Sequence, residues 1–307
     1  TLPELQKRGY PEDMVIGTLS GSGTLGLLIP PSIIMIVYGV AADVSIAQLF
    51  IAGVLPGLLL AGLFSGYIIY WSLRHPDQIP PRDAPMSFMQ KLEASSSLIP
   101  VVLLIAAVLG SIYIGFATAT EAAAVGVMGA LVLSALQGSM SWAVFKDALM
   151  GATRLYCMIA LILAGAAFLT LSMGYIGLPR HLAEWIGGLG LSPLALIMAL
   201  MVFFIILGCF LDGISMVVLT MGVLMPTVQK AGIDPIWFGI FIVFVVEMAQ
   251  ITPPVGFNLF VLQGMTGKQL PYIARVSMPM FFLMVGAVLL IYFVPGIVTW
   301  LPTQMKL

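Results

Sequence analysis

The stretches that decide the fold are Ile29-Pro30-Pro31-Ser32 and Thr252-Pro253-Pro254-Val255, each with two adjacent prolines inside a long apolar segment. The two proline pairs lie 223 residues apart. Further residues coincide at this offset without a gap: Pro3 with Pro226, Gln6-Lys7 with Gln229-Lys230, Gly9 with Gly232, and Pro56 with Pro279. Because proline makes up only 20 of the 307 residues, this agreement predicts an internal repeat in which each copy contains a broken helix.

The composition predicts the class of protein. Apolar residues make up 61% of the chain and charged residues 8%, and the mean hydropathy is +1.12. A soluble domain carries about 25% charged residues, so the chain is expected to be a polytopic membrane protein. Its net charge of −1 argues against binding to nucleic acid or another polyanion. The two cysteines, Cys157 and Cys209, lie in apolar runs, so we expect small buried apolar residues rather than a disulfide or a metal cluster.

Apolar runs of about 20 residues, each bounded by charged residues, glycine or proline, predict the membrane-spanning helices. These runs are 13–42 (broken), 46–72, 97–116, 119–137, 152–173, 235–262 (broken) and 271–300. The stretch 192–229 is interrupted at Gly208-Cys209-Phe210-Leu211-Asp212-Gly213, which favours a re-entrant hairpin over a single span. The pieces 140–150 and 178–188 are expected to form short interfacial helices.

The basic residues predict the orientation, because cytoplasmic loops carry an excess of lysine and arginine. With the start of the chain in the cytoplasm, nine basic residues lie inside: Lys7, Arg8, Arg74, Arg82, Lys91, Lys146, Arg154, Lys268 and Arg275. Three lie outside: Arg180, Lys230 and Lys306. The two broken helices then cross in opposite directions, which makes the repeats inverted. Inverted repeats with broken helices and a re-entrant hairpin are typical of secondary transporters.

This layout predicts four kinds of segment. Residues 1–72 form the transport domain of repeat 1, residues 73–96 a cytoplasmic loop, residues 97–173 the scaffold of repeat 2, residues 174–191 an interfacial arm helix, and residues 192–307 the transport domain of repeat 2. The second copy of the repeat starts near Ser95. Subtracting the offset puts the start of the first copy about 130 residues before Thr1, so we expect the chain to begin inside a longer protein.

The breaks suggest what the protein binds. A Pro-Pro pair removes amide hydrogens and disfavours helix in the preceding residue, so several backbone carbonyls lose their helical partners. Such carbonyls are tolerated at membrane depth only where protein or a polar cavity satisfies them. A cation such as Na⁺ would satisfy them, and the half-helix after each break would direct its positive end toward a carboxylate. The alternative is that the prolines merely kink two buried helices.

Five strings together resemble a known family, the large membrane subunit of tripartite ATP-independent periplasmic (TRAP) transporters. They occur in order along the chain: Gly9-Tyr10, Gly26-Leu27-Leu28-Ile29-Pro30-Pro31-Ser32, Gly115-Phe116-Ala117-Thr118-Ala119-Thr120-Glu121-Ala122, Gly208-Cys209-Phe210-Leu211-Asp212-Gly213 and Thr252-Pro253-Pro254-Val255-Gly256-Phe257-Asn258. The resemblance implies an elevator-type, Na⁺-driven importer of organic acids in a bacterial inner membrane. It also implies a periplasmic substrate-binding protein and a small four-helix membrane subunit as partners.

The same resemblance implies two Na⁺ sites. One would be held by Gly26, Ile29 and Pro31, with its remaining ligands from a serine-bearing hairpin tip outside this sequence. The other would be held by Gly208, Ala249, Thr252 and Val255. Where the family often has a hydroxyl residue, Ala249 can offer only its carbonyl.

The polar residues inside the apolar segments have two readings each. Asp212 is expected to shape the ion or substrate site, or else to cap the returning arm of the hairpin. Glu247 could support the second ion site or make a buried hydrogen bond. Glu121 follows Thr118 at the spacing of a capping box, so we expect it to cap a helix. Since no lysine or arginine falls near either break, Ser32, Asn258 and the bound Na⁺ are expected to hold the anionic substrate.

Three functions remain in competition. The first is the TRAP importer of an organic acid such as a C4-dicarboxylate or sialic acid. The second is a stand-alone Na⁺/carboxylate symporter that needs no binding protein. The third is an integral membrane enzyme that uses Asp212 and Glu247 as an acid pair. The third is disfavoured because the two carboxylates have no nucleophile or metal ligand nearby in the sequence, and we predict that the protein is not an enzyme.

Overall fold

The computed structural model describes residues 2–81, 87, 89–91, 95, 98–253 and 256–305. Every regular element within these ranges is helical. Five helices are long and apolar enough to cross a membrane, or six if the bent pair at residues 12–42 counts as one span. The predicted all-α polytopic fold is therefore confirmed.

The chain divides into two compact units. The first contains residues Thr1–Pro80 and Gly165–Thr303, and the second contains Pro81–Ala164 and Gln304–Leu307. In the second unit, α6 (Ile99–Tyr113) packs against α7 (Ala119–Leu136), and the first part of α8 (Trp142–Ile176) follows. The division of the chain into transport and scaffold roles stays a prediction.

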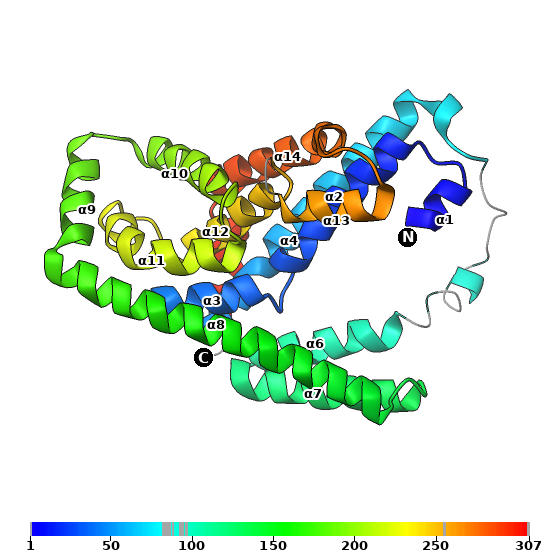
Figure 1. Ribbon diagram of the computed structural model, residues 1–307, viewed down its shortest axis with the longest axis horizontal. Helices are drawn as coiled ribbons and strands as arrows, with labels where there is room; N and C mark the ends of the chain where they lie inside the picture. The colour runs from blue at the N-terminus through cyan, green and yellow to red at the C-terminus, as the bar shows by residue number, and fades with distance from the viewer. Residues whose placement is uncertain are drawn as a thin grey trace. The chain divides into compact units, whose positions relative to one another are not determined.

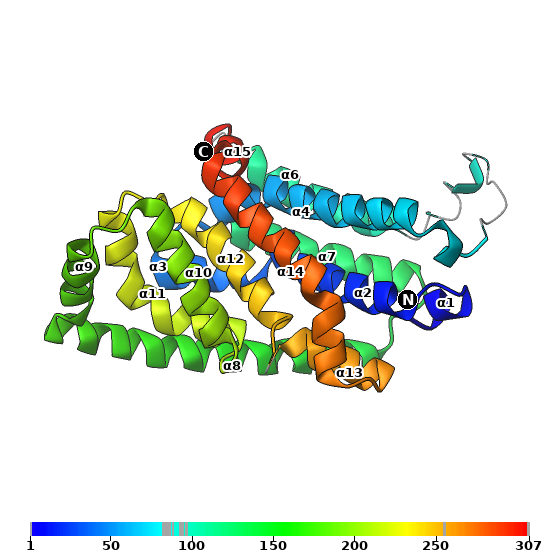
Figure 2. The same ribbon diagram turned by 90° about the horizontal axis from the view of Figure 1, so that it is seen from above.

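The first unit holds both breaks. Its helices are α1 (Leu2–Lys7), α2 (Glu12–Leu28), α3 (Ile33–Ala42), α4 (Ile46–Arg74), η1 (Pro76–Gln78), the end of α8, α9 (Leu178–Gly188), α10 (Pro193–Gly208), α11 (Gly213–Lys230), α12 (Pro235–Gln250), α13 (Phe257–Thr266), α14 (Leu270–Phe293) and α15 (Gly296–Thr303). The centre of this unit is α12, which is buried along its whole length from Trp237 to Ala249. Figures 1 and 2 show α12 running between α10 and α14.

The internal repeat is visible in the helix boundaries. Helix α2 begins at Glu12 and α12 at Pro235, which is an offset of 223 residues. The later pairs, α3 with α13 and α4 with α14, begin 224 residues apart. Gly9 and Gly232 precede α2 and α12 with φ angles of 81° and 72°, a left-handed conformation that favours glycine. Both copies therefore fold into the same succession of turn, helix, break and helix.

Close packing joins the two copies between α2 and α14. A Cβ on Gly17 would overlap the carbonyl oxygen of Val276, and one on Gly21 would lie 2.7 Å from the Met280 side chain. Glycine therefore lets the two backbones approach, as small residues do between membrane helices. At the start of α2, Glu12 forms a 2.8 Å ion pair with Lys268, and Asp13 accepts a hydrogen bond from the Tyr272 hydroxyl.

Two predicted boundaries were wrong. The predicted interfacial helix 140–150 and span 152–173 are one continuous helix, α8, of 35 residues. No proline falls between Trp142 and Ile176, so Gly151 alone does not end the helix. The predicted span 271–300 is instead divided into α14 and α15. The division lies at Val294 and Pro295, where the φ of Val294 is −125° and proline supplies no amide hydrogen.

The other predicted helices agree closely with the structure. Helices at 46–74, 99–113, 119–136 and 178–188 match four predicted segments, and the hairpin 192–229 consists of α10 and α11 with a four-residue tip. The expectation that both cysteines are buried was wrong: Cys157 is exposed and Cys209 is partly exposed, and both are free.

Candidate cation and substrate site

The first break lies between α2 and α3, whose axes bend by 44°. Helix α2 ends at Leu28, and Ile29 takes an extended conformation with φ −78° and ψ 118°. The peptide bond between Pro30 and Pro31 is cis. Because Pro30 and Pro31 donate no amide hydrogen, the carbonyls of the last turn of α2 lose partners that a continuous helix would supply.

Helix α4 supports this break through two glycines that the sequence reasoning did not single out. A Cβ on Gly53 would lie 3.0 Å from the carbonyl oxygen of Leu28 and 3.2 Å from the ring of Pro30. A Cβ on Gly57 would lie 2.9 Å from the Ile29 side chain. The spacing of four residues between these glycines on a membrane helix was the available signal.

The second break follows Gln250, the last residue of α12. The amide of Thr252 donates a 3.3 Å hydrogen bond to the Ala249 carbonyl, and its hydroxyl donates to the carbonyls of Met248 and Ala249 at 3.2 and 3.1 Å. The hydroxyl oxygen of Thr252 therefore keeps its lone pairs for another partner. Val255, predicted to bind Na⁺, lies outside the described residues, as does Pro254.

Gly256 brings main-chain oxygens close together at the second break. A Cβ at this position would lie 2.6 Å from the carbonyl oxygen of Gln250 and 2.9 Å from that of Thr252. Two main-chain oxygens therefore converge on the space that a side chain would fill. The lack of a side chain at Gly256 permits this close approach of backbone.

The tip of the α10–α11 hairpin lies against the second break. A Cβ on Gly208 would overlap the methyl group of Ala249, and the Cys209 thiol donates a 3.4 Å hydrogen bond to the Pro253 carbonyl. Gly213, at the start of α11, also packs closely: a Cβ there would lie 2.5 Å from the Val246 side chain of α12 and 3.3 Å from that of Ile34 of α3. The structure thus brings Gly208, Ala249 and Thr252 together, as a shared site would require.

The residues predicted for the first Na⁺ site lie along the first break, but they are exposed. Gly26, Ile29 and Pro31 are all exposed, and nothing lies within 4 Å of a Cβ built on Gly26. Within the described ranges, no second element closes over these three residues.

Two of the predicted substrate residues cap helices. Asp212 is the N-cap of α11, where its carboxylate accepts hydrogen bonds from the amides of Ile214 and Ser215 at 3.1 and 3.2 Å and from the Ser215 hydroxyl. The capping alternative for Asp212 is therefore present in the structure. Ser32 is buried, and its hydroxyl accepts a 3.4 Å hydrogen bond from the Met35 amide at the start of α3.

Helix α7 confirms the expectation for Glu121. Its carboxylate accepts a 2.8 Å hydrogen bond from the Thr118 amide, and the Thr118 hydroxyl accepts one of 3.3 Å from the Glu121 amide. The two residues form a capping box, so Glu121 needs no further role.

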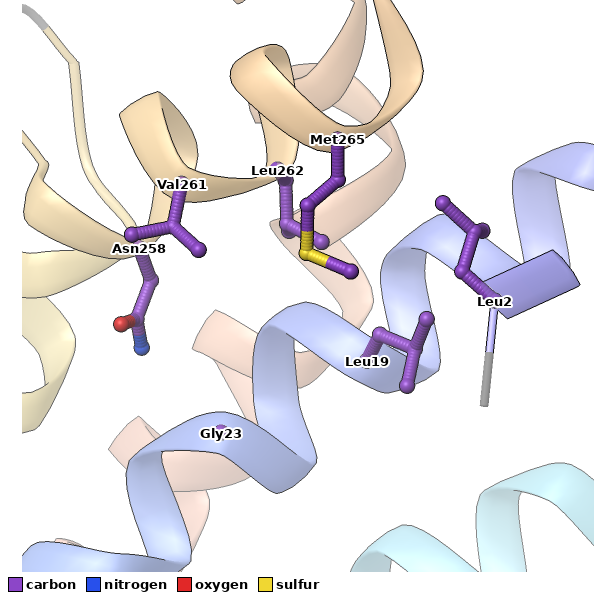
Figure 3. A pocket seen from close by; sticks show the side chains of 7 residues that line it. All are labelled: Leu2, Leu19, Gly23, Asn258, Val261, Leu262 and Met265. Carbon is purple, nitrogen blue, oxygen red and sulfur yellow. The ribbon is translucent and has the colours of Figure 1, made fainter. Parts of the chain in front are cut away.

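Asn258 borders a cavity of about 220 Å³ between α1, α2 and α13. Figure 3 shows its amide directed from α13 toward Gly23 of α2. The amide nitrogen is buried and has no hydrogen-bond partner among the residues that the structure describes. The rest of the wall is apolar: Leu2, Leu19, Val261, Leu262 and Met265. Asn258 therefore has a free donor for a ligand oxygen.

Glu247 is the one fully buried carboxylate in the described part of the chain. It lies in the last turn of α12, facing the backbone of Leu28 at the end of α2, so it lies between the two breaks. Neither carboxylate oxygen makes a hydrogen bond within the described ranges. An unpaired charge at such a site is costly, so a cation or a proton is the expected partner.

The donors near the second break fit a hard cation such as Na⁺. They are main-chain carbonyls, the Thr252 hydroxyl and the nearby Glu247 carboxylate, all of them oxygen ligands. Oxygen donors suit hard cations, whereas softer transition metals favour imidazole and thiolate. No group of three or more His, Cys, Asp or Glu side chains able to hold a metal occurs among the described residues.

A buried core of helices broken at related positions defines a polytopic membrane transporter. Residues 1–297 match the family described as tripartite ATP-independent periplasmic transporter, DctM component. The chain belongs to this family, and the predicted resemblance is confirmed. With its apolar spanning helices, it is a multi-pass protein of the bacterial inner membrane.

Curated relatives agree with this assignment. The chain is 34% identical to the C4-dicarboxylate TRAP transporter large permease protein DctM of Pseudomonas aeruginosa, over 96% of this chain and 69% of the relative. It is 32% identical to the isethionate TRAP transporter permease protein DctMQ of Oleidesulfovibrio alaskensis, over 97% of this chain and 47% of the relative. It is also 32% identical to the ectoine/5-hydroxyectoine large permease protein UehC of Ruegeria pomeroyi, over 97% and 69%.

Proposed function

We propose that the protein imports an organic acid together with Na⁺, by an elevator-type movement, after delivery of the acid by a periplasmic binding protein. A small four-helix membrane subunit completes the assembly. The observation that carries the proposal is the contact of the hairpin tip with the second break, where Gly208 meets Ala249 and Cys209 bonds to Pro253. Family membership and the permease names of the relatives favour a transporter over an enzyme.

The second break is the better supported Na⁺ site. Thr252 has free lone pairs, the carbonyls of Gln250 and Thr252 converge at Gly256, and Gly208 lies against Ala249. Val255 is proposed as a further ligand by family resemblance. Gly26, Ile29 and Pro31 are proposed for the first site, and their exposure leaves room for ligands from another segment.

The substrate is proposed to be an organic acid because of the chemistry near the breaks. No lysine or arginine occurs in the sequence between Arg8 and Arg74 or between Lys230 and Lys268. A carboxylate would therefore bind to the Asn258 amide, to amide groups at the starts of α3 and α13, and to the charge of bound Na⁺. Names of the relatives extend from C4-dicarboxylate to isethionate and ectoine, so the choice of acid is left to the experiment below.

Coupling to Na⁺ would give the uptake its driving force. If two or more Na⁺ accompany one monoanion, net positive charge moves inward. Each such charge contributes about 2.3 kcal/mol per 100 mV of membrane potential. Binding of substrate would depend on sodium, because the site offers no cationic side chain from these stretches of sequence.

Uptake into proteoliposomes tests the proposal. The complete permease is reconstituted with its small subunit, and uptake of a panel of radiolabelled acids is measured with and without a Na⁺ gradient and with and without the binding protein. We expect uptake of one class of acid only when both the Na⁺ gradient and the binding protein are present. Uptake that needs Na⁺ but no binding protein would favour a stand-alone symporter, and uptake without Na⁺ would contradict the proposal.

A further inference from the structure

A second cavity, of about 180 Å³, lies where α9 packs on the α10–α11 hairpin. Figures 1 and 2 both show α9 beside α11. Five apolar residues line the cavity, namely Ala183, Ile186, Leu191, Leu196 and Ala231, together with Gly187, Thr227 and Lys230. The cavity is therefore apolar on one side and has a cation and a hydroxyl on the other.

Around this cavity, positively charged side chains outnumber negatively charged ones. Arg180 and Glu184 pair with each other at 2.9 Å, and Arg180 lowers the pKa of Glu184 through this hydrogen bond and its charge. Lys230 makes no ion pair within 4.0 Å in the described part of the chain. A Cβ on Gly187 would lie 3.8 Å from the Lys230 ammonium, so the absence of a side chain at residue 187 leaves space beside the cation.

The Thr227 hydroxyl has no partner. Other buried helical hydroxyls of this chain, such as those of Thr220 and Ser277, donate to a carbonyl one turn earlier. Thr227 is only 4% exposed, and its hydroxyl makes no hydrogen bond among the described residues. A buried hydroxyl without a partner is unfavourable, so a ligand that accepts a hydrogen bond from it is stabilised by that bond.

The depth of the cavity indicates which ligand it takes. Lys230 is the last residue of α11, at the base of the α10–α11 hairpin, and the base of a hairpin that enters the membrane lies at the level of the lipid headgroups. Helix α9 exposes Trp185 and Leu178 alongside its charged residues, as interfacial helices do. Basic pockets at span ends bind anionic headgroups. We propose that this cavity binds the phosphate of a phospholipid headgroup through Lys230 and Thr227, with the glycerol and first acyl carbons on the apolar wall.

Native mass spectrometry of the complete permease in detergent tests the site. The purified protein is titrated with phosphatidylglycerol, with diacylglycerol, which lacks the phosphate, and with inorganic phosphate as a competitor. We expect one tight phosphatidylglycerol adduct, no equivalent diacylglycerol adduct, and no displacement by inorganic phosphate at equal concentration. Equal binding of diacylglycerol, or displacement by inorganic phosphate, would overturn the lipid assignment.

Matched variants locate the binding. Lys230→Gln should weaken the adduct about fivefold and Thr227→Val about threefold, whereas Lys230→Arg should retain it. Gly187→Leu should block the cavity without a change of charge. Gly188→Leu, where a side chain meets nothing within 4 Å, and Lys146→Gln should leave binding unchanged. Thermal unfolding checks that each variant is folded, and binding unaffected in both Lys230→Gln and Gly187→Leu would refute the site.

Discussion

The hydroxyl of Tyr38 in α3 donates a 2.7 Å hydrogen bond to the carbonyl oxygen of Pro235, the first residue of α12. Tyr38 is fully buried, and its ring lies over Gly239, where a Cβ would approach it to 2.6 Å. This bond joins the half-helix after the first break to the helix before the second. The two copies of the repeat are therefore linked by a specific polar contact as well as by apolar packing.

Tyr38→Phe removes this link. The ring still fills its place over Gly239, so the loss is that of one buried hydrogen bond, about 1 kcal/mol of unfolding free energy. Thermal unfolding of the detergent-solubilised protein measures the change. Tyr175→Phe is the matched control because Tyr175 is 92% exposed. A melting temperature lowered equally by both substitutions would argue against the link.

Gly17→Ala should separate α2 from α14. The added Cβ would meet the Val276 carbonyl, a backbone atom that moves only if the helix moves, and such overpacking costs about 1–3 kcal/mol. Gly286→Ala on α14 adds the same methyl group where nothing lies within 4 Å, and there we expect no loss. If the two alanine variants unfold at the same temperature, the close packing does not contribute to stability.

Thr252→Ala should weaken activation by sodium more than it lowers expression. The substitution removes a side-chain oxygen at the second break, so half-maximal uptake should require about fivefold more Na⁺. Thr252→Ser keeps the hydroxyl and should restore the curve. An alanine variant with the same sodium activation curve as the wild type would count against this site.

Substitutions of Asp212 separate capping from substrate binding. Alanine should cost about 1 kcal/mol of stability, because the amides of Ile214 and Ser215 lose their acceptor. Asparagine keeps a cap and should restore the melting temperature. Uptake by Asp212→Asn then decides the second role: uptake at the wild-type level assigns Asp212 to capping, whereas loss of uptake in the stable variant assigns it to the site.

Glu247→Gln tests whether a cation neutralises the buried carboxylate. The wild-type protein should melt at a higher temperature as Na⁺ is added, because a ligand that binds the folded state stabilises it. We expect this increase to be at least halved in the glutamine variant, with K⁺ as the control salt for ionic strength. A sodium-dependent increase of the same size in both proteins would exclude Glu247 from cation binding.

Much of the fold could be predicted because its causes are local. Apolar length predicts a spanning helix, and Pro30-Pro31 breaks a helix wherever it occurs, since the missing amide hydrogens are a covalent property. The repeat was visible from prolines and glycines for the same reason. There are two exceptions. In α8, the charged residues and Gly151 were taken as a boundary that the helix in fact crosses, and before α15, apolar length was given more weight than Pro295.

The candidate site was predictable in part. The sequence predicted the hairpin tip and the second break as two separate interruptions of apolar segments. Family resemblance then grouped Gly208 with Ala249. The supporting residues Gly53 and Gly57 were missed because the sequence does not show which backbone atoms approach a glycine. Whether Asp212 caps α11 or shapes the binding site was left open, because an aspartate at the tip of a hairpin can do either.

The sequence by itself determined that this chain is a membrane protein with two related broken helices, because apolar length and the chemistry of proline act within one segment. The tertiary structure decided which segments meet: Tyr38 with Pro235, Gly208 with Ala249, Glu247 with the end of α2. Such meetings depend on the packing of residues up to about 220 positions apart, which local patterns do not encode.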